Sequence, residues 1–223
     1  MTRILIAITT AETVHHETME SIFNLQRTED MQVGLKIIHS YDVANGRTEL
    51  VRIAQANKVD YIFYVDSDVI LPRGALIKLL QADKDIVLGT YPRKEDKTFL
   101  SDNPYTTLYR HSDKNKECFC PYWLPQNELP KEGIIPVDCG GLGCALIKMS
   151  VFETIKAPWF VFVKENANLE EGAYCIGEDM YFFRECLMHD IQPYAEGSVR
   201  CGHIGKYVYT LKLEVPNQVP NVI

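Results

Sequence analysis

VDYIFYVDSD, residues 59–68, is the stretch that decides the fold. Residues 61–65 form an unbroken apolar and aromatic run, which is typical of a central strand with both faces covered. Asp66 and Asp68 follow where that strand is expected to end, and ligands of open α/β sheets bind just beyond the carboxyl ends of strands. Two neighbouring carboxylates repel each other unless a cation lies between them, so the stretch predicts a divalent-metal site. The alternative is a polar exit from a strand, since Asp-x-Asp also occurs by chance.

The rest of the chain alternates between strand-like and helix-like patterns. Besides residues 61–65, we predict strands at residues 3–10, 32–39, 86–89 and 191–194 (the last at a sheet edge), and helices at residues 12–26, 48–55 and 72–80. This β-α-β-α-β order is what a parallel, doubly wound sheet requires. Residues 97–136 are polar and contain several prolines, which suggests an insertion or flap.

Bulk properties set further limits. A chain of 223 residues with 46% hydrophobic and 24% charged residues suits one sizeable globular domain. The net charge of -7 disfavours a nonspecific nucleic-acid binder. No apolar stretch approaches the ~20 residues of a spanning helix, and the first residues lack a signal-peptide pattern. Seven cysteines without regular spacing indicate reduced thiols, so we expect a cytoplasmic protein.

Two later blocks also carry chemistry. Three glycines within residues 140–143 precede an apolar run, which indicates that something approaches the backbone closely. They match neither a Rossmann fingerprint nor a Walker loop. Glu178 and Asp179 open a predicted helix, where acidic residues are also stabilising as simple caps. His203 lies between two glycines near the end of the chain.

In their order and spacing, these blocks resemble a glycosyltransferase of the GT-A fold, in the family-2-like group. The resemblance extends from the first strand to the Gly-His pair. It implies a mostly parallel central sheet flanked by helices, in a single domain over residues 1–214. The nucleotide-sugar half would span residues 1–95, the acceptor half residues 96–214, and a tail residues 215–223.

On the donor side, the resemblance implies that Asp66, Asp68 and His203 hold Mn²⁺, or Mg²⁺, on the diphosphate of a nucleotide sugar, with a UDP-sugar favoured. Contacts to that donor are further implied for Thr9, Thr10, Arg47, Ser67, Arg93, Gly140, Gly141 and Lys206. Alternatives stay open. The threonines also suit a helix cap, Arg47 an exposed helix start, and Arg93, with Lys94 beside it, a solvated basic turn.

On the acceptor side, the resemblance implies that Asp179 takes the proton from the attacking hydroxyl while Glu178 orients the acceptor, with inversion at the sugar. The acceptor could be a saccharide, a lipid-linked glycan, a protein or a modified nucleic-acid base. Two rival functions remain. A nucleotidyltransferase would normally have a glycine-rich loop after the first strand, which residues 8–12 lack. A non-catalytic sugar- or nucleotide-binding relative would keep the same residues.

Overall fold

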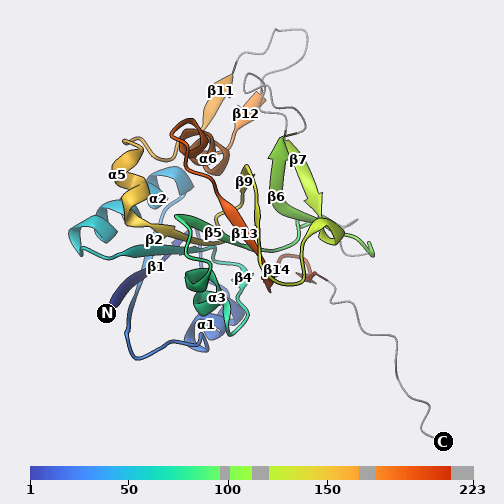
Figure 1. Cartoon of the computed structure of the whole chain (residues 1–223), viewed down its shortest axis with the longest axis horizontal. Helices are drawn as coiled ribbons and strands as arrows, with labels where there is room; N and C mark the ends of the chain where they lie inside the picture. The colour runs from blue at the N-terminus through green and yellow to red at the C-terminus, as the bar shows by residue number, and fades with distance from the viewer. Residues whose placement is uncertain (96–100, 112–120, 166–173, 212–223) are drawn as a thin grey trace, which may run out of the picture.

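The computed structural model describes residues 1–95, 101–111, 121–165 and 174–211. A seven-stranded sheet with helices on both faces forms the centre of the molecule (Figure 1). Its strands, in spatial order, are β2 (Met31–His39), β1 (Thr2–Thr10), β3 (Tyr61–Val65), β10 (Cys144–Lys148), β5 (Ile86–Thr90), β13 (Tyr194–Arg200) and β8 (Ile134–Pro136). The expectation of a single α/β domain is confirmed.

The sheet is mixed in direction. Strand β1 pairs in parallel with β2 and β3, and β5 pairs in parallel with β13. Strand β10 runs antiparallel to both β3 and β5, and β8 runs antiparallel to β13. The chain enters β10 from the edge at which β3 ends, so β10 has to run the opposite way. Its first residues therefore lie beside the end of the central strand.

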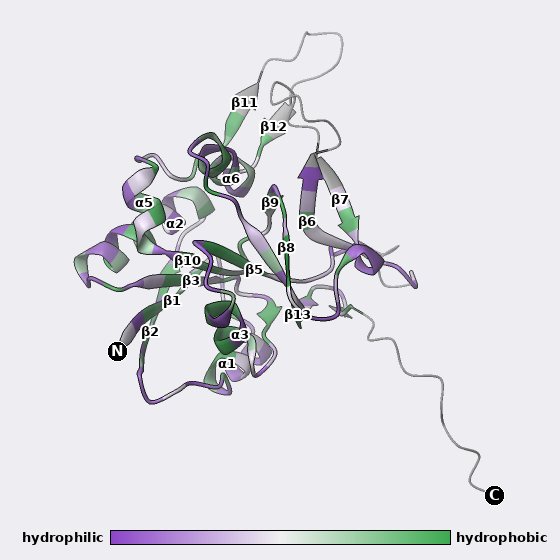
Figure 2. Cartoon of the chain, viewed as in Figure 1, coloured by the Kyte–Doolittle hydropathy of each residue, from purple (hydrophilic) through white to green (hydrophobic). Residues whose placement is uncertain are grey.

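Both faces of β3 are buried, as its apolar run predicts. Ile62 and Tyr64 pack into one core with α2 (Val43–Ala56), α5 (Met149–Thr154) and α6 (Glu178–Met188). Phe63 and Val65 pack into a second core with α1 (His16–Phe23) and α3 (Ala75–Gln81). Figure 2 shows hydrophobic colour along β5 and β10 at the centre. The Asp-x-Asp segment is thus carried on a strand packed from both sides.

Helix α2 begins five residues before its predicted start. The Asp42 carboxylate caps it by accepting from the backbone N–H of Asn45 at 3.1 Å. Gly46 lies within the helix. The residue at this position has to be glycine, because a Cβ there would come within 2.7 Å of the Thr9 methyl. Helix packing against β1 overrides the low helix propensity of Gly46. Arg47 is consequently inside the helix rather than at its opening.

The described residues also form three smaller sheets. They are β4 (Val69–Ile70) with β14 (Gly202–Ile204) and β15 (Val208–Tyr209); β6 (Tyr105–His111) with β7 (Pro121–Pro125) and β9 (Cys139–Gly140); and β11 (Val163–Glu165) with β12 (Tyr174–Ile176). A 3-10 turn, Gln126–Glu128, follows β7. The region 97–136, expected to be irregular, thus contains strands in its described parts. The prediction of an edge strand at residues 191–194 was wrong. Strand β13 begins only at Tyr194, and β8 pairs with it on the side away from β5, so β13 is not at the edge of the sheet.

The pairing of β4 with β14 brings the Asp-x-Asp segment and the Gly-His pair together. His203 is the register partner of Val69, which follows the Asp-x-Asp. The backbone N–H of Ile204 donates to the carbonyl of Asp68 at 2.8 Å. The backbone pairing of the two strands therefore places His203 beside Asp68.

Two further expectations concern location and redox state. None of the described helices is long and apolar enough to cross a membrane. Cys139, Cys144, Cys186 and Cys201 are free and buried. The tail predicted at residues 215–223 falls outside the described residues.

Gly89, the residue before the end of β5, allows β5 to pack closely against Cys144 of β10 and Val199 of β13. A Cβ there would lie 2.5 Å from the Cys144 sulfur and 2.8 Å from a Val199 methyl. We expect Gly89→Ala to lower the free energy of unfolding by roughly 1–3 kcal/mol through overpacking. Gly34→Ala is the matched control, since its nearest atom would be a Leu5 methyl at 3.8 Å. The control should leave stability unchanged or raise it by up to about 1 kcal/mol. Equal effects of the two variants in urea denaturation would contradict this packing.

Candidate active site

Three strand ends meet at one edge of the central sheet. Asp66 follows β3, Tyr91 follows β5, and Gly143 precedes the reversed strand β10. The backbone N–H of Asp66 donates to the Gly143 carbonyl at 3.2 Å, and that of Gly143 donates to the Tyr91 hydroxyl at 2.8 Å. A Cβ on Gly143 would come within 2.7 Å of both the Asp66 carboxylate and the Tyr91 hydroxyl. Only glycine lets these three ends approach so closely.

The other two glycines of this block also serve close packing. A Cβ on Gly141 would lie 2.2 Å from the Tyr91 hydroxyl, and one on Gly140 would lie 2.5 Å from a Leu88 methyl. The expected close approach to the backbone is thus made by the protein's own side chains. Donor contacts of Gly140 and Gly141 remain predictions.

Arg47 is the buried cation of this edge. Only 4% of its surface is exposed. One terminal nitrogen donates to Asp66 at 2.9 Å, and the other contacts the carboxylate of Glu178. Burial lowers the pKa of Arg47, but the charges of Asp66 and Glu178 outweigh it and raise the pKa, so the guanidinium stays charged. The alternative of an exposed arginine at a helix start was therefore wrong. The donor contact of Arg47 remains a prediction.

Glu178 and Asp179 open α6 in different surroundings. Glu178 is buried and tied to Arg47, whereas Asp179 is half-buried and accepts from the backbone N–H of Met180 at 2.8 Å. Burial raises the pKa of each carboxyl above its ordinary value, with Arg47 acting in the opposite direction. Glu178 is therefore fixed in place, and Asp179 is the better placed of the two to accept a proton.

Asp68 forms a second cluster with His203 and Lys94. Its Oδ1 lies 3.6 Å from the His203 Nε2, and its Oδ2 contacts the Lys94 ammonium. Burial raises the pKa of Asp68, but Lys94 and the protonated form of His203, through their hydrogen bonds and charges, outweigh it and bring the pKa to about 2. Nδ1 of His203 donates to the Pro92 carbonyl at 2.8 Å. In the neutral ring this leaves the lone pair on Nε2, facing Asp68.

Asp68 and His203 are the two side chains that could together bind a divalent cation at this edge. Among the described residues, no group of three or more His, Cys, Asp and Glu side chains is gathered as a metal site. Asp66, expected as the third ligand, is turned to Arg47. The carboxylate of Asp68 and the Nε2 lone pair of His203 nevertheless converge. A cation that takes its other ligands from diphosphate oxygens and water would fit them.

The hydroxyl residues near the strand end make local contacts. Thr10 donates through its hydroxyl to the Thr13 carbonyl at 2.8 Å and accepts from the Glu12 N–H at 3.3 Å. The helix-cap alternative was wrong, because α1 begins at His16 after His15, with no side-chain cap. The Ser67 carbonyl accepts from the backbone N–H of His15 at 2.9 Å. Donor contacts of Thr9, Thr10 and Ser67 remain predictions.

Besides Arg47, two basic residues were expected to contact the donor, and each has a partner of its own in the protein. The guanidinium of Arg93 packs 3.7 Å above the Trp123 ring and pairs with Glu95 at 2.6 Å. Trp123 in turn packs on Tyr109, with ring centres 3.6 Å apart. Lys206 is exposed and lies 5.5 Å from the ring centre of Tyr207. No role was predicted for Trp123 or Tyr109, although both belong to the aromatic residues scattered through region 97–136.

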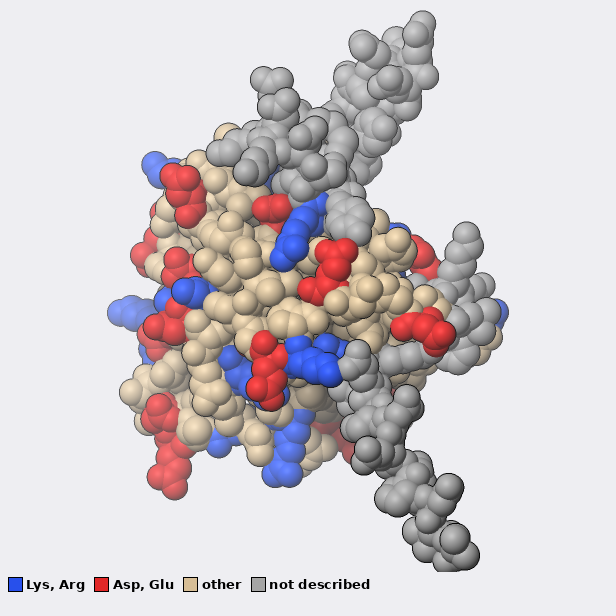
Figure 3. Space-filling model, turned by 45° about the vertical axis from the view of Figure 1, so that its right-hand side comes forward, with Lys and Arg blue, Asp and Glu red and all other residues tan. Residues whose placement is uncertain are grey.

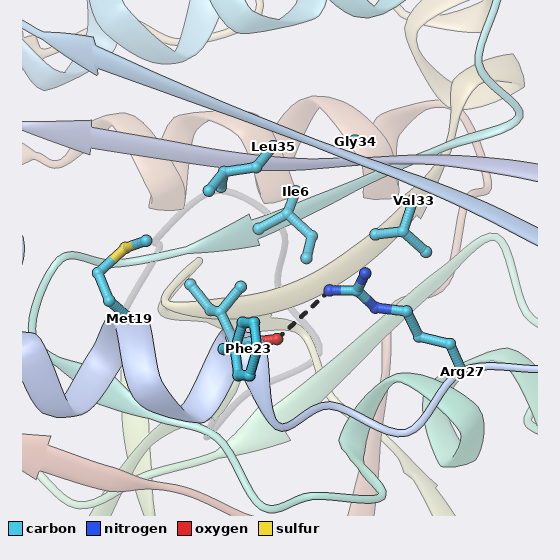
Figure 4. Close-up of a pocket in the computed structure, with 8 residues that line it drawn as sticks. Ile6, Met19, Phe23, Arg27, Val33, Gly34 and Leu35 are labelled. Carbon is cyan, nitrogen blue, oxygen red and sulfur yellow. Dashed lines mark hydrogen bonds between the residues drawn. The ribbon is translucent and has the colours of Figure 1, made fainter.

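The described clefts lie away from these carboxylates. A groove of about 170 Å³ runs between α1 and β2, and its lining includes Met19, Phe23, Arg27 and Leu35 (Figure 4). A second cleft of about 480 Å³ lies between α3, the approach to β8, and β13. On the face drawn in Figure 3, acidic and basic side chains lie in small mixed groups rather than in one basic surface.

Comparisons with known proteins show the fold alone. No family model and no curated protein matches the chain. The crystal structure of A197 from STIV matches with a TM-score of 0.60 and 20% sequence identity, and covers 100% of both chains. The similarity extends over the whole length, so the chain shares one complete α/β fold with that viral protein.

The buried pairing of Arg47 predicts a large effect on stability. Arg47→Met would leave the carboxylates of Asp66 and Glu178 without their cation, so we expect the free energy of unfolding to fall by about 3–5 kcal/mol. Arg52→Met on the same helix is the matched control, because Arg52 is exposed and pairs at 3.4 Å with an exposed Glu49. Its cost should stay below about 1 kcal/mol.

A double variant identifies the cause. Adding Glu178→Gln to Arg47→Met removes one uncompensated charge, so we expect part of the loss to be recovered in urea denaturation. Equal costs for the Arg47 and Arg52 variants would show that the two ion pairs do not stabilise the fold.

Proposed function

We propose that the chain is a glycosyltransferase of the GT-A fold that moves a sugar from a nucleoside-diphosphate sugar, with a UDP-sugar favoured, to an acceptor hydroxyl. One observation carries the proposal. The Asp66-Ser67-Asp68 segment at the end of the central strand is linked through Arg47 to the Glu178-Asp179 pair that opens α6. Metal-type carboxylates and a candidate base, far apart in sequence, thus lie at one sheet edge, where α/β folds bind ligands.

On the donor side, Asp68 and His203 would hold Mn²⁺ or Mg²⁺. When bound, the ion would neutralise the diphosphate that leaves as the glycosidic bond breaks. The imidazole of His203 favours Mn²⁺ over Mg²⁺, which prefers an all-oxygen shell. In this proposal Asp66 orients the site through Arg47 rather than acting as the third ligand.

On the acceptor side, Asp179 is the proposed general base. The acceptor oxygen attacks the anomeric carbon while the bond to the diphosphate breaks, and the hydroxyl proton passes to Asp179. A carboxylate with a raised pKa holds that proton better than an ordinary aspartate does. Glu178, held by Arg47, orients the acceptor. Attack opposite the leaving group gives inversion at the anomeric carbon.

The donor site is tested by calorimetric titration with UDP, GDP, CDP and dTDP, each with and without Mn²⁺. We expect one of them, UDP by preference, to bind only with the metal, and Asp68→Ala to weaken that binding by roughly 10–100-fold or more. Asp85→Ala is the control, since Asp85 pairs with Lys148 at 3.3 Å, outside the site. If no diphosphate binds in a metal-dependent way, the proposal as stated is wrong.

The base is tested by Asp179→Asn. Sugar transfer should fall by about 10²–10⁴-fold, while metal-dependent diphosphate binding stays at the wild-type level. Full transfer by a folded variant would remove Asp179 from this role. A wild-type chain that binds the diphosphate but transfers no sugar to any acceptor of a broad panel would favour a non-catalytic relative.

The raised pKa of Asp179 also predicts a pH-dependent effect on stability. Above that pKa the folded chain holds a carboxylate that burial disfavours, so ionised Asp179 lowers stability. Asp179→Asn should therefore raise the unfolding temperature at pH 7.5, by roughly 2–4 °C for each kcal/mol recovered. The difference should shrink as the pH falls and vanish below the unfolded pKa of about 3.9, where Asp179 is protonated in the folded and the unfolded chain. A variant less stable than the wild type at pH 7.5 would contradict this.

A further inference from the structure

Lys94 occupies a defined position against the Asp-x-Asp segment. Its aliphatic stem lies along Gly205, where a Cβ would come within 3.2 Å of its Cδ and 3.6 Å of its Cγ. Its ammonium contacts Oδ2 of Asp68. The two side chains are 32% and 26% exposed, so the contact is partly shielded from water. Gly205 thus leaves the space in which the lysine reaches Asp68.

The turn that carries Lys94 is held on both sides. The Pro92 carbonyl accepts from Nδ1 of His203 at 2.8 Å. The backbone N–H of Arg93 donates to the Tyr105 carbonyl at 3.1 Å, and its guanidinium packs on Trp123. These contacts hold the backbone of the turn, while the four-carbon stem of Lys94 can still change rotamer. The ammonium can therefore leave Asp68 without a rearrangement of the fold.

Asp68 cannot serve Lys94 and a divalent cation equally well. His203 Nε2 faces Oδ1 of Asp68 at 3.6 Å, and the lysine ammonium occupies Oδ2. A cation shared by Asp68 and His203 would lie close to that ammonium, and like charges in a partly buried site repel each other. The ammonium currently does what a metal would do, which is to neutralise the Asp68 carboxylate.

We propose that Lys94 and the divalent cation exchange at Asp68: the ammonium is the counter-ion of the carboxylate without metal, and metal binding releases it. This inference rests on the proposed function, because it takes Asp68 and His203 as the metal ligands. The released ammonium lies on a turn beside the metal site, where the donor's diphosphate would offer it a new anionic partner. Lys94 then opposes binding of the metal alone and favours binding of the metal together with a diphosphate.

The test measures Mn²⁺ binding by the full chain without nucleotide, from the electron paramagnetic resonance signal of free Mn²⁺. Lys94→Gln should lower the Kd for Mn²⁺ by roughly tenfold or more, because it removes the competing charge. Lys94→Arg keeps the charge and should stay near the wild-type value. Lys78→Gln is the control, since the Lys78 ammonium contacts the Ser198 hydroxyl at 3.0 Å in another part of the fold. Lys94→Met serves as a second neutral variant.

A second titration adds the diphosphate that the wild type prefers. With Mn²⁺ at saturation, we expect Lys94→Gln to bind it roughly tenfold more weakly than the wild type, because the released cation is missing. If the wild type binds Mn²⁺ and diphosphate but the neutral variants bind Mn²⁺ no tighter, the exchange is wrong and the proposed function stands. If neither the wild type nor the variants bind Mn²⁺, the metal site is wrong and the exchange falls with it.

Discussion

The guanidinium of Arg47 is the charge on which the rest of the site depends. A buried cation is costly unless carboxylates compensate it, and here the two partners come from the end of β3 and from the start of α6, 19 and 131 residues further along the chain. Helix α2, the central strand and α6 must therefore adopt one relative geometry for this charge to be buried at all. The ion pairs that compensate the buried charge of Arg47 also set the positions of the Asp66 and Glu178 carboxylates at the sheet edge.

Arg47 also gives the two members of each acidic pair different partners. In the Asp-x-Asp segment it holds Asp66, while Asp68 faces His203 and Lys94. At the start of α6 it holds Glu178, while Asp179 is half-buried and its Oδ1 accepts from the backbone N–H of Met180. Within each acidic pair, one carboxylate is thus bound to the Arg47 guanidinium and the other is not. In the proposed reaction Asp68 acts on the donor side and Asp179 on the acceptor side.

Local pattern was enough to predict part of this arrangement. The apolar run at 61–65 predicted a strand buried on both faces, because its period and composition depend only on neighbouring residues. The direction of β10 and the pairing of Arg47 with Glu178 could not be predicted in that way, because they depend on contacts between distant segments. The start of α2 was missed since Gly46 has low helix propensity and fits only because it packs on Thr9. The order of the three motif blocks suggested a common site, but not that Asp66 would turn to Arg47.

The central claim is that Asp68 and His203 form a metal site at the end of the central strand. It is tested most directly by anomalous diffraction at the manganese edge, from crystals of the full chain grown with Mn²⁺ and the preferred nucleoside diphosphate. The account predicts one strong peak at direct ligand distance from the Asp68 carboxylate and from Nε2 of His203, with diphosphate oxygens completing the shell. A diphosphate bound at this edge with no manganese peak between these two side chains would contradict it.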